Sequence, residues 1–163
     1  MSITFNADEI FEIAEQIERN GAQFYRNASG RFTDPAARDK LLDLAVMEDD
    51  HEKTFAEMRM DVSVSEKMST SFDPDSEAVL FLQSIADGKI FNIKKNPSEI
   101  LAEGITIEEI LKQAIELEKD SVVFYTGIRE MLSEKIGKKK VNDIINEEIG
   151  HIFDLGNQLS ALS

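Results

Sequence analysis

Two stretches decide the fold: LDLAVMEDDHEKTF at residues 42–55 and NDIINEEIGHIFDL at residues 142–155. Each contains a glutamate followed three positions later by a histidine, Glu48 with His51 and Glu148 with His151, and these are the only two histidines in the 163-residue chain. Residues three apart lie on the same face of a helix. Each pair can therefore direct one carboxylate and one imidazole at a single point.

The two stretches belong to a longer repeat with an offset of 100 residues. Between residues 6–61 and 106–161, ten of the 56 positions are identical. The identical residues are Glu9, Ile10, Ala14, Glu18, Phe24, Tyr25, Lys40, Asp43, Glu48 and His51, with their counterparts 100 positions later. Because polar residues on the inner helix faces are retained in both halves, we interpret the chain as one domain, residues 1–163, built from a duplicated helix hairpin.

Helix signals surround both copies, and the chain has only three prolines and eight glycines. We predict helices at about residues 7–29, 35–60, 107–132 and 138–159. Their starts are marked by a capping-box pattern or by a capping residue before proline. The signals are Asn6 with Glu9, Asp34-Pro35, Asp73-Pro74, Asn96-Pro97 and Thr106 with Glu109.

The connections predict how these helices are arranged. Short links join the first helix to the second and the third to the fourth, so each pair should form an antiparallel hairpin. Residues 62–105 form a long crossover, in which we expect a short helix near residues 74–86. Two hairpins joined by one long crossover predict an all-α, ferritin-like antiparallel four-helix bundle.

The composition of the chain limits which partners and which kinds of metal site it can have. The net charge of −14 argues against binding to nucleic acid or to an anionic membrane surface. No segment approaches the ~20 apolar residues of a membrane span, and the start of the chain lacks a secretory signal, so we expect a cytoplasmic protein. The absence of cysteine excludes thiolate metal sites. Any metal must be held by oxygen and imidazole ligands.

The predicted site contains four glutamates facing one another inside the bundle. They are Glu18, Glu48, Glu118 and Glu148, accompanied by His51 and His151. Four buried carboxylates repel one another and lose hydration, whereas two divalent cations balance their combined charge of −4. One glutamate from each of two helices, with Glu-x-x-His from each of the other two, is the ligand pattern of di-iron carboxylate bundles. We predict two iron ions per chain, with manganese or zinc as alternatives.

With these residues the chain resembles the rubrerythrin-type branch of the ferritin-like superfamily. The resemblance implies that Glu48 and Glu148 bridge the metals, that Glu18 and Glu118 are terminal ligands, and that the hydroxyl of a tyrosine lies near each bridging glutamate. The tyrosines are Tyr25 and Tyr125. It also implies that peroxide or dioxygen oxidises a diferrous centre, which an external donor then reduces again.

Two departures from the family qualify this expectation. Rubrerythrins commonly carry a rubredoxin-like domain with four cysteines, so here electrons must come from a separate protein. They also carry an additional carboxylate one turn after the third-helix ligand, where this chain has Ser121, with Gly21 at the matching position of the first half. Glu15, one turn before Glu18, is a candidate substitute for it.

Other interpretations stay open at this point. The chain can be an iron-handling or storage module of the ferroxidase type, or a bundle whose acids are structural. Tyr25 and Tyr125 can simply pack in the core. We interpret Asp49, Asp50 and Glu147 as surface residues. The apolar residues within 79–93 predict a homodimer, for which the long crossover makes domain swapping feasible.

Overall fold

The computed structural model describes residues 7–64, 101–132, 134 and 137–163. Its four long helices are α1 (Ala7–Ser29), α2 (Pro35–Val64), α5 (Ile107–Met131) and α6 (Lys138–Ser160). The predicted bounds agree to within one residue, except that α2 continues four residues further than expected. The short helix expected near residues 74–86 and the apolar segment 79–93 lie outside the described residues.

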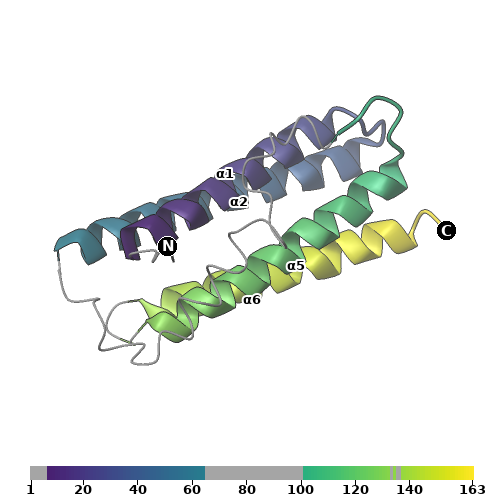
Figure 1. Cartoon of the computed structure of the whole chain (residues 1–163). Coiled ribbons are helices and arrows are strands. Elements are labelled where there is room, and N and C mark those ends of the chain that lie inside the picture. Colours follow the sequence, from purple (N-terminus) through teal and green to yellow (C-terminus); the bar gives the residue numbers. More distant parts are fainter. Residues whose placement is uncertain (1–6, 65–100, 133, 135–136) are drawn as a thin grey trace, which may run out of the picture.

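The helices form two antiparallel hairpins that lie against each other. In Figure 1, α1 runs beside α2 in one layer and α5 runs beside α6 in the other. α2 ends and α5 begins at opposite ends of the bundle, as expected for hairpins joined by a long crossover. The predicted all-α four-helix bundle is confirmed. No helix in the described part of the chain is both long enough and apolar enough to cross a membrane.

Local signals account for the starts of α2, α5 and α6, whereas the predicted cap Asn6 lies outside the described residues. The Thr106 side chain accepts from the backbone N–H of Glu109, whose carboxylate accepts from the Thr106 backbone, which completes the predicted capping box. At the start of α2, the backbone N–H of Ala37 donates to Asp34 Oδ2 over 2.8 Å. α6 begins after Gly137, whose φ of 111° lies in the left-handed region that favours glycine.

Two apolar clusters fill the interior and leave a polar layer between them. One cluster includes Ile10 and Phe55, and the other includes Phe24 and Leu41. Along every helix, residues of the two clusters lie on either side of the predicted metal ligands. The ligands therefore lie midway along the bundle, where apolar side chains separate them from both ends.

The capping box of α5 gives a stability prediction. Thr106→Ala removes the acceptor at the helix start and should lower the free energy of unfolding by about 1 kcal/mol. Thr54→Ala is the control, because the Thr54 hydroxyl bonds to Asp50 O within α2 and alanine is the better helix former. Urea unfolding followed by circular dichroism measures both. Equal stability of the two variants would contradict the role of the cap.

Candidate metal centre

All four helices contribute to one buried polar cluster midway along the bundle. Its members, with their exposed fractions, are Glu18 (0%), Glu48 (4%), His51 (4%), Glu118 (3%), Glu148 (0%) and His151 (2%). α1 and α5 supply one glutamate each, whereas α2 and α6 each supply a glutamate and a histidine one turn apart. The structure thus brings together all six residues predicted as ligands.

The six residues form two overlapping groups of four. Glu18 and His51 belong to one group, Glu118 and His151 belong to the other, and both groups share Glu48 and Glu148. Within each group the candidate ligand atoms lie within 4.8 Å of one another. A pair of ions held in these groups would share two carboxylates, which is the division that the rubrerythrin resemblance implies.

Both imidazoles present Nδ1 to the carboxylates. His51 Nδ1 lies 2.9 Å from Glu148 Oε1 and 3.4 Å from Glu18 Oε2. His151 Nδ1 lies 2.9 Å from Glu148 Oε2 and 3.4 Å from Glu48 Oε1. These are ion-pair distances, but the same Nδ1 and Glu148 oxygen atoms have no aligned hydrogen-bond partner among the described residues.

These atoms provide a test of whether the cluster fits a metal. Buried polar atoms are normally hydrogen-bonded, and leaving one unpaired costs about 1–3 kcal/mol. Here at least one ligand atom on each of five cluster residues is buried and has no hydrogen-bond partner in the described chain. The residues are Glu18, Glu48, Glu148, His51 and His151. Carboxylate oxygen and imidazole nitrogen atoms that converge without hydrogen-bond partners are suitable ligands for two divalent cations such as iron or manganese.

Burial changes the protonation of the carboxylates. Burial raises the pKa of Glu18, Glu48 and Glu118 well above the ordinary value, and the charges of neighbouring carboxylates raise it further. Glu148 is the exception. Burial favours its neutral form, but its contacts with His151 and His51 outweigh this effect and hold its pKa below the usual range.

The pKa values of both imidazoles are raised, whereas burial in apolar surroundings lowers the pKa of a histidine. Burial lowers the pKa of His51, but Glu148 and Glu147 beside it raise the pKa to about 9. Burial also opposes the charged form of His151, whereas Glu118, Glu148 and Glu48 raise its pKa to about 12. In the metal-free fold these histidines and three of the glutamates therefore hold protons more tightly than usual, and an incoming cation must displace those protons.

Two tyrosines connect the hairpins across the centre. The Tyr25 hydroxyl donates to Glu118 Oε1, and the Tyr125 hydroxyl donates to Glu18 Oε1. The two contacts are related by the 100-residue offset. The resemblance implies hydroxyls near Glu48 and Glu148, whereas in the structure they lie on the carboxylates of the other two glutamates. Burial raises the pKa of both tyrosines, so both hydroxyls remain donors.

Glu15 and position 121, the two places considered for an additional carboxylate, lie outside the two ligand groups. Glu15 lies in neither ligand group, and its Oε2 is 3.5 Å from Arg59 Nη1. The Ser121 hydroxyl donates to Leu117 O within α5. At the matching position of α1, a Cβ added to Gly21 would lie only 2.8 Å from Glu48 Oε2. Because Gly21 has no side chain, the Glu48 carboxylate can occupy this space.

One contact of the centre was missed by the sequence analysis. Glu147, interpreted as a surface residue, accepts a hydrogen bond from His51 Nε2 over 2.7 Å, although its side chain is 51% exposed. Asp49 and Asp50 match the prediction, because they pair with Arg26 and Lys53 near the surface. The two halves differ here, with Glu147 at the place of Met47, and we interpreted this difference as a sign of a surface position.

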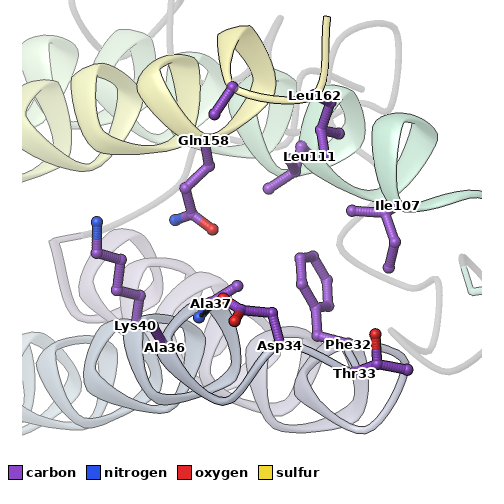
Figure 2. Close-up of a pocket in the computed structure, with 11 residues that line it drawn as sticks. Phe32, Thr33, Asp34, Ala36, Ala37, Lys40, Ile107, Leu111, Gln158 and Leu162 are labelled. Atoms are coloured by element: carbon purple, nitrogen blue, oxygen red, sulfur yellow. Dashed lines mark hydrogen bonds between the residues drawn. The ribbon is translucent and has the colours of Figure 1, made fainter.

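A separate hollow of about 330 Å³ lies at one end of the bundle. Figure 2 shows it between the α1–α2 link, with Phe32, and the start of α5, with Leu111. The Gln158 amide points into it from α6. None of its lining residues belongs to the buried carboxylate cluster.

Four antiparallel helices around two Glu–His groups define the class of ferritin-like carboxylate bundles. The chain is similar to a Thermotoga maritima protein of known structure that is described as a ferritin-like di-iron carboxylate protein, with a TM-score of 0.72, 25% sequence identity and 98% of each chain covered. No protein-family model and no curated protein matches the chain. The fold is ferritin-like, and the buried cluster fits a di-iron protein.

Filling the space at Gly21 should weaken metal binding without destabilising the fold. Gly21→Ala places a methyl group where Glu48 Oε2 lies, so the carboxylate must move and Co²⁺ affinity should fall by about tenfold. Stability of the metal-free protein should be retained, because alanine favours the helix. Calorimetric titration and thermal unfolding separate the two effects.

Gly156→Ala is the matched control for Gly21→Ala. Nothing lies within 4 Å of a Cβ added at Gly156, so this variant should gain helix stability and keep the wild-type Co²⁺ affinity. If both glycine variants bind Co²⁺ equally well, Gly21 has no role in placing Glu48.

Protonation of the cluster predicts how metal binding depends on pH. Three glutamates and both histidines have raised pKa values, so each holds its proton more tightly in the metal-free fold. Binding must release these protons, and the apparent Co²⁺ affinity should rise between pH 6 and pH 8. Titration in two buffers of different ionisation enthalpy counts the released protons. A flat pH profile without proton release would contradict this prediction.

Proposed function

We propose that the chain is a rubrerythrin-like di-iron oxidoreductase that reacts with peroxide or dioxygen and depends on a separate electron donor. The observation that carries the proposal is the pair of overlapping buried groups, each with one imidazole and three carboxylates, of which two are shared. Two ferrous ions, when bound, supply the two electrons that reduce one peroxide to two waters with two protons. The absence of cysteine means that the chain supplies no thiolate cluster to replace those electrons.

The side chains have distinct parts in this proposal. Glu48 and Glu148 reach both ligand groups, and Glu18 and Glu118 each complete one of them. Hydrogen bonds from Tyr125 and Tyr25 hold one oxygen of Glu18 and Glu118, leaving the other oxygen of each carboxylate for a metal. The apolar clusters on either side keep water from competing at these polar atoms.

A second candidate function is ferroxidase-type iron handling or storage, in which iron is the substrate. It is favoured by one observation: no carboxylate occupies the position at Ser121 where rubrerythrins carry an additional one. The Ser121 hydroxyl bonds within its own helix, and Glu15 lies in neither ligand group, near Arg59. The two candidates differ in the preferred oxidant and in the fate of the iron.

The partners also belong to the proposal. We expect two protein partners: a separate electron donor and a second copy of the chain. In the homodimer, the long crossover is long enough to allow domain swapping. Gel filtration at micromolar concentration tests the dimer, and a monomer would contradict it. Neither nucleic acid nor a membrane is an expected partner of a chain with a net charge of −14.

The metal content tests the proposal directly. Anaerobic titration should give two ferrous ions per chain, and Glu48→Ala should weaken binding by more than the ~10–100-fold typical of losing an outer partner of a ligand. Asp49→Ala is the control, because it removes the neighbouring acid, which pairs with Arg26 near the surface. Binding of far fewer than two ions by the wild-type chain would refute the proposal.

The oxidant separates the two candidate functions. Stopped-flow mixing of the diferrous protein should show faster oxidation by H₂O₂ than by O₂ for a rubrerythrin-like enzyme, with no retained mineral. Faster oxidation by O₂ with iron retained as mineral would favour the storage function.

A further inference from the structure

The two histidines of the cluster differ in what their outer nitrogen atoms meet. His51 Nε2 donates to Glu147 Oε2 over 2.7 Å. His151 Nε2 is buried and has no hydrogen-bond partner among the described residues. The inner Nδ1 atoms, by contrast, both face the carboxylates. This difference between the two histidines therefore lies on the outer side of the rings, away from the ligand atoms.

Divergence of the duplicated sequence explains this difference. Glu147 immediately precedes Glu148 on α6, and its carboxylate crosses to His51 on α2 of the other hairpin. The 100-residue offset places Met47 at the corresponding position of α2. A thioether is only a weak acceptor, so position 47 offers His151 no carboxylate of the kind that position 147 offers His51.

A carboxylate on the outer nitrogen alters a metal-binding imidazole. It fixes the ring orientation, keeps the proton on the outer nitrogen and makes the inner nitrogen more basic. Loss of such a partner typically costs about 10–100-fold in metal affinity. Because the Glu147 side chain is half exposed, its carboxylate can do this without the full cost of burying another charge.

We propose that Glu147 is a positioning residue for His51 and that it makes the two metal positions inequivalent. The His51 position, with Glu18, Glu48 and Glu148, binds a divalent ion more tightly and fills first. The His151 position fills second. This inference rests on the proposed two-metal site and adds an order of filling that the symmetric ligand set does not contain.

The test uses Co²⁺ and the full metal-free chain. Calorimetric titration should show two binding steps whose affinities differ by about tenfold or more. Crystals grown with one equivalent of Co²⁺ should show anomalous density mainly beside His51. Neither measurement depends on the activity of the loaded protein.

Exchanging Glu147 and Met47, the residues that differ between the halves, gives the most direct test of the proposal. Glu147→Met should weaken the tighter step by about tenfold or more and equalise the anomalous density. Met47→Glu should strengthen the weaker step, and the double exchange should move the first ion to His151. Glu147→Gln, which keeps an acceptor oxygen, should lose less affinity than Glu147→Met. Asp154→Asn, which removes an exposed charge from the same helix, controls for net charge.

The outcomes separate this inference from the proposed function. Two ions bound with equal affinity, or no response of either step to Glu147→Met, would overturn the role of Glu147 and leave the two-metal site in place. A wild-type chain that binds no Co²⁺ would overturn both.

Discussion

The structure depends on compensating four carboxylates buried in one layer of an apolar bundle. Their desolvation and mutual repulsion oppose folding, and the neighbouring residues reduce this cost. Two imidazoles supply opposite charge, and two tyrosine hydroxyls each bond one carboxylate oxygen. Because the pairs Tyr25–Glu118 and Tyr125–Glu18 each join α1 to α5, the polar layer also fixes how the two hairpins register against each other.

The sequence predicted the four helices and the meeting of the six cluster residues because periodicity determines which side chains share a helix face. It did not determine which partner each side chain meets across the bundle. Glu15 lies one turn from Glu18, yet Arg59 of α2 lies beside it. Glu147 lies off the inner face, yet its side chain reaches His51. Such contacts depend on side-chain rotamers and on the spacing between helices, which a single-helix pattern does not encode.

The 100-residue sequence repeat relates the ligands of the two halves, but their contacts are not fully symmetric. Gly21 leaves space for the Glu48 carboxylate, whereas Ser121 carries a side chain at the matching position. Glu148 approaches both imidazoles at 2.9 Å, while Glu48 lies 3.4 Å from His151. The two shared glutamates are therefore held differently, although the residues themselves are identical.

This arrangement argues against acids that serve only structure. Replacing a buried ion cluster by apolar residues of similar volume is often neutral or stabilising by about 1–4 kcal/mol, so packing alone gives no reason for four glutamates among leucine and isoleucine. Without metal, several inward-facing atoms of the cluster have no hydrogen-bond partner in the described chain. Divalent cations would satisfy those atoms, and their binding energy would stabilise the folded state. Binding of such cations would then explain the cost of burying the cluster.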